Sequence, residues 1–221
     1  KRYLGYKYEY DANKEPNRTS MGIVTKRRDN APIVKYVFGN IIEMILNQTN
    51  KDPILWLNNT LQDIIDGKLP MSMYIITKTL NGYYKNPGGI AHKVLADRMA
   101  IRDPGNKPKA NDRIPFVYRE VGNEFIINGY KSEKKRIENG KFKNGNTKYK
   151  TITVQGEPKY KRRKILQGER VEHPDYIKNN EDENIDYRFY ISNQIMNPVK
   201  QILDLKWDSK SNDELFNQFI N

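Results

Sequence analysis

The clearest structural signal in this chain lies in residues 29–46, which read D-N-A-P-I-V-K-Y-V-F-G-N-I-I-E-M-I-L. Apolar residues recur there in pairs at helical spacing, so one side of the predicted helix is a broad apolar stripe. We expect Asp29 or Asn30 to cap its N-terminus, with Pro32 in the first turn because the φ angle of proline is already near the helical value. This pattern predicts one long helix that buries one side.

Further helices are predicted along the chain. One begins at Asp52-Pro53 and ends before Gly67, where glycine suits the C-terminal position. Another runs over residues 89–102 and is stopped by Asp103-Pro104-Gly105. A last one covers 187–203, with a kink at Pro198. The sequence contains no internal repeat, and these segments predict a small, mainly helical domain.

A few strands complete the predicted fold. Extended segments are expected at residues 6–10, 21–25, 74–78, 114–118 and 124–127. The first two, joined by a turn over 11–20, are predicted to form a β-hairpin at the edge of a sheet whose other strands lie upstream of Lys1. Residues 124–127 are the candidate hairpin partner of 114–118. The predicted fold class is therefore α+β, predominantly helical with a few antiparallel strands.

The composition excludes several kinds of protein. The 221 residues carry 39 Lys plus Arg and 27 Asp plus Glu, a net charge of +12, which indicates a polyanionic partner. The absence of Cys excludes a disulfide framework and Cys-ligated metal sites. The longest uncharged stretch, 189–199, is 11 residues and too short to cross a bilayer. The chain opens at Lys1 with no Met and no apolar signal region, so we expect part of a longer, non-secreted protein.

Most of the excess charge lies in residues 129–168, which contain 13 basic and 3 acidic side chains. This block has five Gly and few aliphatic residues, so it can bury little apolar surface. We predict a surface insertion that is partly mobile. Two interpretations remain open: a solvated loop, or a flexible arm that neutralises phosphates without choosing a sequence.

No catalytic or metal-binding set emerges from the sequence. Asp97, Asp103 and Asp112 are single carboxylates, and nothing in their spacing forces the convergence that a pair of metal ions needs. His92 and His173 are interpreted as structural residues. We therefore expect no catalytic residue and no metal site within this chain.

Basic residues beside aromatic or helix-terminal positions are better candidates for function. Lys1 and Tyr3 occupy alternate positions, so they lie on the same side of a strand. Lys26-Arg27-Arg28 precedes the first helix, and Arg98, Arg102 and Arg113 surround the turn at 103–112. Three such clusters in a chain at +12 favour a shared phosphate-binding surface.

At these residues the chain resembles a known family, the family B DNA polymerases. Lys1-Arg2-Tyr3 is similar to the Lys-x-Tyr motif of their delta-like replicative group, although the chain begins one residue late for the full motif. Similar segments follow in the family's order: 21–32 with R-R-D-N-x-P, 76–78, 91–99, 102–105, 112–117, 172–177 and 187–198. The residues of these segments are most similar to those in the polymerases of large DNA viruses.

The resemblance implies a domain organisation and a role. Residues 1–28 would be the end of the palm, 29–206 the thumb with its insertion at 129–168, and 207–221 a C-terminal tail. The aspartates that hold Mg²⁺ and the fingers helix lie upstream of Lys-x-Tyr in the family, so the chain is expected to be inactive alone and to bind no cofactor. It would help nucleotidyl transfer by holding primer–template duplex through the minor groove and phosphates.

The resemblance also implies contact residues and partners. The expected DNA-binding residues are Lys1, Tyr3, Lys26, Arg27, Arg28, Lys78, Lys93, Arg98, Arg102 and Arg113. The expected partners are primer–template DNA, the palm, fingers and exonuclease parts of the polymerase, and a sliding clamp, although residues 200–221 contain no convincing clamp-binding motif. The expected location is the site of replication, in the nucleus or in a viral factory. The alternatives are a stand-alone, non-enzymatic protein that binds double-stranded nucleic acid and an independent nuclease.

Overall fold

The structure is a computed structural model that describes residues 3–8, 10, 14–21, 30–47, 52–122 and 124–220. The chain divides into two compact units. Unit 1 comprises residues 1–120 and 166–221, and unit 2 comprises residues 121–165. Helices combine with antiparallel sheets, which confirms the predicted α+β class.

The N-terminal hairpin is present, with strands that differ from those predicted. β1 (Tyr3–Lys7) pairs antiparallel with β2 (Asn17–Met21), so that Tyr3 lies opposite Met21. The expected turn over 11–20 is wrong in its second half, because residues 17–20 belong to β2. The Tyr6 hydroxyl donates to the side chain of Asn47 at 3.0 Å, which joins the hairpin to the end of α1.

Two helices follow as the apolar periodicity predicts. α1 (Pro32–Leu46) buries its apolar stripe, and α2 (Pro53–Ile65) begins with the side chain of Asp52 accepting from the Ile54 N–H at 2.9 Å. Gly67 follows α2 with a φ of +67°, the left-handed conformation that glycine adopts without strain. Asn30 does not cap α1, because Ala31 holds the N-cap position without a side-chain hydrogen bond; Asp29 lies outside the described residues.

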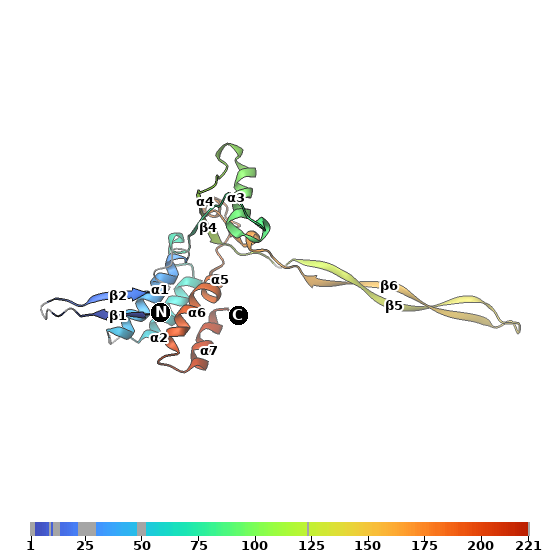
Figure 1. Cartoon of the computed structure of the whole chain (residues 1–221). Coiled ribbons are helices and arrows are strands. Elements are labelled where there is room, and N and C mark those ends of the chain that lie inside the picture. The colour runs from blue at the N-terminus through green and yellow to red at the C-terminus, as the bar shows by residue number, and fades with distance from the viewer. Residues whose placement is uncertain are drawn as a thin grey trace. The chain divides into compact units, whose positions relative to one another are not determined.

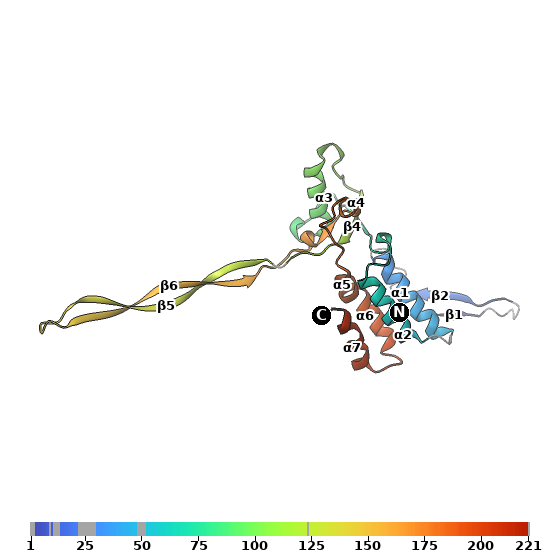
Figure 2. The same cartoon turned by 180° about the vertical axis from the view of Figure 1, so that it is seen from behind.

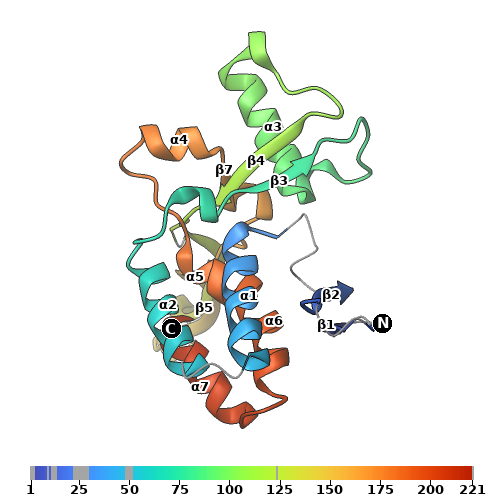
Figure 3. The ribbon, with the colours of Figure 1, turned by 90° about the vertical axis from the view of Figure 1, so that its left-hand side faces the viewer.

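The C-terminal helices complete a bundle with α1 and α2. α5 (Tyr187–Phe189), a π-helical segment (Tyr190–Ile195) and α6 (Met196–Leu203) follow one another without a break. The kink predicted at Pro198 stays a prediction, and the π-helical segment ends three residues before this proline. Proline lacks the N–H that would bond one turn back, and its ring would crowd the carbonyl there, so the helix widens before it. α1, α2, α6 and α7 lie side by side (Figure 3).

The segment predicted as a tail contains α7 (Ser209–Ile220), whose Leu215, Phe216 and Phe219 are buried in the core. Its Asn212 donates to Asp204 at 2.8 Å, which fixes the turn between α6 and α7. Residues 209–220 are therefore part of the packed structure of unit 1.

A small sheet forms the other part of unit 1. Its strand order is β3 (Ile76–Thr79), β4 (Arg113–Tyr118) and β7 (Val171–Glu172), all antiparallel neighbours. α3 (Ala91–Arg102) packs against β4 and β7, and α4 (Pro174–Asn179) against β4. Short 3₁₀ turns occupy Met71–Met73, Pro87–Gly89, Pro104–Asn106 and Gln167–Arg170.

One buried hydroxyl connects the sheet to the helices. The Tyr190 side chain is fully buried; its hydroxyl donates to the Tyr74 carbonyl at 2.6 Å and accepts from the Tyr118 N–H at 3.0 Å. The rings of Tyr74 and Tyr190 also meet edge to face at 5.2 Å. Burial raises the pKa of Tyr190, so the hydroxyl stays protonated and able to donate.

Unit 2 is a long two-stranded ribbon. β5 (Phe125–Lys141) pairs antiparallel with β6 (Thr147–Arg162), and the two strands wind around each other in both views (Figures 1 and 2). The prediction that 124–127 pairs with 114–118 is wrong, because Phe125 lies opposite Arg162. Residues 129–162 of the predicted surface insertion lie in this paired ribbon, and residues 166–168 belong to unit 1.

Within the described part of the chain, no helix has both the length and the apolar character needed to span a membrane.

Candidate nucleic-acid interface

A buried carboxylate fixes α3 to the small sheet. Glu172 is fully buried and accepts two hydrogen bonds from Arg102, both 3.0 Å long, and one from the His173 N–H at 2.9 Å. The guanidinium of Arg98 lies 3.6 Å from the same carboxylate and donates to the Val171 carbonyl. Burial acts to raise the pKa of Glu172, but these donors and charges outweigh it and hold the pKa below its usual value.

Arg98 and Arg102, two of the predicted DNA contacts, are therefore already engaged inside unit 1. They lie four residues apart on one side of α3, toward β7. Arg102 also places its guanidinium 3.9 Å from the ring centre of Tyr176 in α4. The Nε atom of Arg98 is buried and has no hydrogen-bond partner among the described residues. These contacts hold α3 to the sheet and to α4, and 39% of the Arg102 side chain stays exposed.

Lys78 and Lys93 lie near the N-terminal half of α3. Burial and the charge of Lys78 lower the pKa of His92, while a hydrogen bond with the backbone of Thr79 opposes them. The His92 ring lies 3.0 Å from the Tyr84 hydroxyl, so the expectation of a structural histidine agrees with its surroundings. Lys93 pairs with Asp97 one turn along α3.

Arg113 lies on the opposite side of the sheet from Lys78. Lys78 is paired with Ile114, and Thr79 with Arg113. Successive residues of a strand point to opposite faces, so Lys78 shares the face of buried Ile114, and exposed Arg113 the other face. Among the residues that the structure describes, the predicted cations Lys78 and Arg113 thus do not share one face of the sheet.

Two neighbouring loops bring further cations to one end of the sheet. We call residues 80–90 and 103–112 the loop pair, because the Asn111 N–H donates to the Leu80 carbonyl at 2.7 Å and the Leu80 N–H to the Asp112 carbonyl at 2.8 Å. Both loops extend beyond the same end of β3 and β4 (Figure 3). The loop pair and the adjoining strand carry the exposed residues Tyr83, Lys85, Lys107, Lys109 and Arg113.

The cations of the loop pair can contact a ligand from solution. Lys85, Lys107, Lys109 and Arg113 form no ion pair with any residue that the structure describes. The nearby carboxylates have other partners: Asp103 accepts from Asn106, and Asp112 accepts from the Lys109 N–H. The sequence patterns did not single out Tyr83, Lys85, Lys107 and Lys109, although only Asn106 separates K-P-K at 107–109 from the segment 102–105.

The predicted residues at the N-terminus are described only in part. Tyr3 lies in β1 with 51% of its surface exposed, so its ring is accessible. Lys1, Lys26, Arg27 and Arg28 lie outside the described residues and stay predictions.

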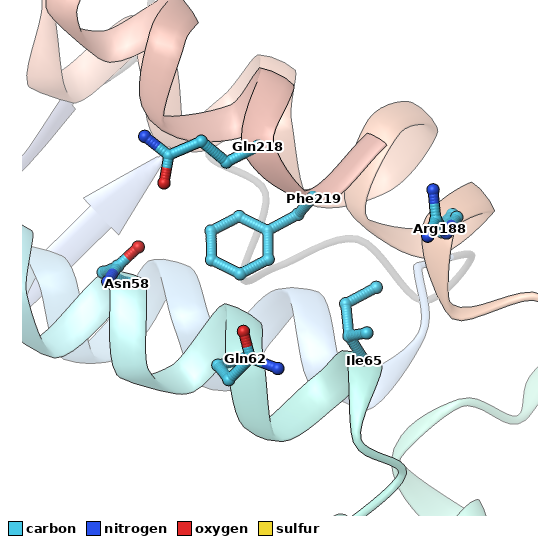
Figure 4. Close-up of a pocket in the computed structure, with 6 residues that line it drawn as sticks. All are labelled: Asn58, Gln62, Ile65, Arg188, Gln218 and Phe219. Atoms are coloured by element: carbon cyan, nitrogen blue, oxygen red, sulfur yellow. The ribbon is translucent and has the colours of Figure 1, made fainter. Parts of the chain in front are cut away.

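A pocket of about 310 Å³ lies among α2, α5 and α7 of unit 1 (Figure 4). Its lining residues are Asn58, Gln62, Ile65, Arg188, Gln218 and Phe219. These lining residues include no acidic side chain, no histidine and no Ser, Thr or Cys.

The described residues do not fit a pair of catalytic metal ions. Among them, no three His, Asp or Glu side chains gather closely enough to hold one ion. A two-metal site needs several converging carboxylates. We therefore derive no chemical step from the residues of this chain.

Comparison with known proteins identifies the family. Residues 1–206 match the sequence profile of the family described as DNA polymerase family B. The chain belongs to DNA polymerase family B. A protein named DNA polymerase from Acanthamoeba polyphaga mimivirus is 42% identical to it over an alignment of 224 residues, which covers the whole of this chain. One of the same name from Pyramimonas orientalis virus is 41% identical over 93% of the chain.

The family B match extends to cellular proteins over part of the chain. The DNA polymerase delta catalytic subunit of Schizosaccharomyces pombe is 36% identical over 44% of this chain and 9% of its own length. These findings confirm the predicted resemblance to delta-like and viral family B polymerases. The chain spans only 11% and 14% of the two viral relatives.

Proposed function

We propose that this chain is the palm-edge and thumb part of a replicative, DNA-directed DNA polymerase of family B. The family membership of residues 1–206 is the observation that carries the proposal. The catalytic aspartates and their Mg²⁺ lie outside residues 1–221 in this proposal, and the chain alone is inactive. Its own task is to hold primer–template duplex so that the primer end is positioned for nucleotidyl transfer.

The duplex contacts are proposed at exposed cations of unit 1. Lys85, Lys107, Lys109 and Arg113 support this role because they are exposed and form no ion pair with any described residue. Lysines and arginines of this kind bind phosphates and give affinity that depends on salt more than on sequence. Lys78 and Lys93 beside α3 and Tyr3 in β1 are further proposed contacts. Lys1 is proposed at the minor-groove side of the primer end, and Lys26, Arg27 and Arg28 at the root of the thumb.

Arg98 and Arg102 take a different part in this proposal. Their guanidinium groups are held by Glu172 and the Val171 carbonyl, so they position α3 rather than bind phosphate as their main role. The exposed part of Arg102 leaves room for one outward contact.

The proposed partners are primer–template DNA, the palm, fingers and exonuclease parts of the same polymerase, and a sliding clamp. The proposed location is the site of replication, in the nucleus or in a viral factory. Family membership favours this role over a stand-alone nucleic-acid-binding protein.

The test compares two double variants of the polymerase that contains this chain. Lys107→Gln with Lys109→Gln should make the negative slope of log affinity against log salt for primer–template duplex shallower by about 1.8, since each phosphate contact contributes about −0.9. The control, Lys206→Gln with Lys210→Gln, removes the same charge near α6 and α7 and should leave the slope unchanged. An unchanged slope in the first variant would contradict the proposed contacts.

A further inference from the structure

The ribbon of unit 2 has no core of its own. Every residue of β5 is exposed, and β6 is also mostly exposed, with a few partly buried positions such as Ile152 and Val154. An isolated two-stranded ribbon is marginally stable in water, because it buries little apolar surface. The ribbon nevertheless exposes large side chains at Phe125, Ile126, Ile127, Tyr130, Ile137, Phe142, Tyr149 and Tyr160. Such a surface is typical of a binding element.

The charge of the ribbon indicates an anionic ligand. Residues 121–165 carry 13 basic and 4 acidic side chains, a net charge of +9 out of +12 for the whole chain. Two of the four carboxylates are taken by ion pairs within unit 2, Lys131 with Glu157 and Arg163 with Glu124. Lys134, Lys135 and Lys150 are exposed and form no ion pair with any residue that the structure describes.

The pairing register sorts the middle of the ribbon into two different faces. Paired residues share a face and successive residues alternate. One face, the cationic face, holds Ser132, Lys134, Arg136, Glu138, Tyr149, Thr151, Thr153 and Gln155. The other, the aliphatic face, holds Glu133, Lys135, Ile137, Lys150, Ile152 and Val154.

Each face carries two basic residues and one glutamate, so the cationic face differs from the aliphatic face by its hydroxyl groups and by one stacked pair, not by its net charge. The Arg136 guanidinium lies 4.3 Å from the ring centre of Tyr149. Stacking holds the guanidinium in place while its N–H edge stays available for a phosphate oxygen. The hydroxyls of Thr151 and Thr153 lie on the same face. This chemistry suits phosphates and base edges, whereas the centre of a protein–protein interface is depleted of charge.

The dimensions of the ribbon match a groove of a double helix. The 17 residues of β5 extend over roughly 55 Å at about 3.3 Å per residue. That length equals about 16 base pairs measured along the helix axis at 3.4 Å each, and fewer along the winding path of a groove. The major groove of B-form DNA is about 12 Å wide and admits a two-stranded β-ribbon. At the far turn, exposed Phe142 lies under the Lys148 ammonium at 4.8 Å.

We propose that the ribbon is a second duplex-binding element, which lays its cationic face along a groove of double-stranded DNA. This inference rests on the proposed function, because its ligand is the duplex that the polymerase extends. The contacts come from Lys134 and Arg136 to phosphates, with Tyr149 holding Arg136 and the threonine hydroxyls donating beside them.

The experiment uses the polymerase that contains this chain and two matched variants. Lys134→Gln with Arg136→Gln removes two charges from the cationic face, and Lys135→Gln with Lys150→Gln removes two from the aliphatic face. Affinity for a blunt 30-base-pair duplex and for a single strand of equal length is measured by fluorescence anisotropy across a salt series. The first variant should make the negative slope of log affinity against log salt for the duplex shallower by about 1.8. The second should change it by less than half as much.

The remaining outcomes overturn the proposal. Equal losses in both variants would mean diffuse attraction without a binding face. An equal effect on the single strand would contradict groove binding. An unchanged duplex slope in both variants would show that neither face of the middle of the ribbon contacts phosphates, which contradicts the proposal. A result that contradicts DNA binding by the ribbon can be told apart from one that contradicts the proposed function, because Lys107→Gln with Lys109→Gln tests DNA binding by unit 1 in the same assay.

Discussion

Replacing Glu172 with Gln should destabilise unit 1 strongly while leaving its shape almost unchanged. Gln keeps the volume of Glu but removes the charge that Arg98 and Arg102 both face. The carboxylate is fully buried, so no solvent compensates for its loss. Breaking a buried ion pair by removing one partner costs about 3–5 kcal/mol. Because Arg102 is partly exposed and can turn toward water, we expect the lower end, about 3 kcal/mol.

The measurement is urea and thermal unfolding of the 221-residue chain. A loss of about 3 kcal/mol corresponds to a fall in melting temperature of roughly 6–12 °C for a chain of this size. The matched control is Asp97→Asn, which removes one negative charge from an exposed ion pair with Lys93 on the same helix. Exposed pairs contribute about 0–1 kcal/mol, so the control should unfold near the wild type.

The dependence on pH separates charge from packing. The folded-state pKa of Glu172 is lowered, so its contribution is present above the unfolded value near 4.5 and is lost as the pH falls through the folded value. The difference in stability between wild type and Glu172→Gln should therefore be constant above about pH 5.5 and shrink below pH 4.5. A variant as stable as the wild type at pH 7, or a difference that does not shrink in acid, would refute the role of the buried charge.

Three further substitutions test other features. Gly168→Ala should lower the free energy of unfolding by about 1–3 kcal/mol, because an added Cβ would lie 2.5 Å from the Cβ of Val94 in α3. The control is Gly39→Ala, at an open position of α1. It should raise the free energy of unfolding by up to about 1 kcal/mol in the same assay. Tyr190→Phe leaves the Tyr118 N–H and the Tyr74 carbonyl without their hydrogen-bond partner, so the free energy of unfolding in urea should fall by about 1–3 kcal/mol. An unchanged urea midpoint would contradict this role of the hydroxyl. In the intact polymerase, Lys1→Ala should reduce primer extension more than duplex affinity, and equal losses would indicate simple anchoring.

The helices could be predicted from the sequence because their signals are local. Apolar spacing and proline located α1, and Asp52, Pro53 and Gly67 located both ends of α2. The predicted boundaries of β1 and β2 were less accurate, since apolar and polar residues alternate only weakly in a short hairpin of polar residues and tyrosines. Local rules also missed α7, where apolar residues at 215, 216 and 219 follow a helical spacing within a polar, acidic segment.

Long-range partners could not be predicted. Residues 124–127 were assigned to the nearest strand in sequence, whereas they pair with 160–162, because the register of a ribbon is set by strand pairing across its turn. The partner of Arg98 and Arg102 is Glu172, 70 residues beyond Arg102, and nothing in the spacing of the arginines reveals it. The sequence therefore identified the right kind of residue for phosphate binding, and only the fold separates the arginines held inside unit 1 from the exposed cations.

This separation predicts how the salt dependence of DNA binding divides between the units. Unit 2 carries +9 of the chain's +12, so deleting it should make the negative slope of log affinity against log salt shallower by more than Lys107→Gln with Lys109→Gln does. The deletion should remove residues 121–165 and not 129–168, because Gly168 packs against Val94. Unit 1 should still unfold cooperatively, since its buried core lies outside 121–165. A slope unchanged by the deletion would place the duplex contacts in unit 1 alone, and loss of cooperative unfolding would make the ribbon a structural part of that unit.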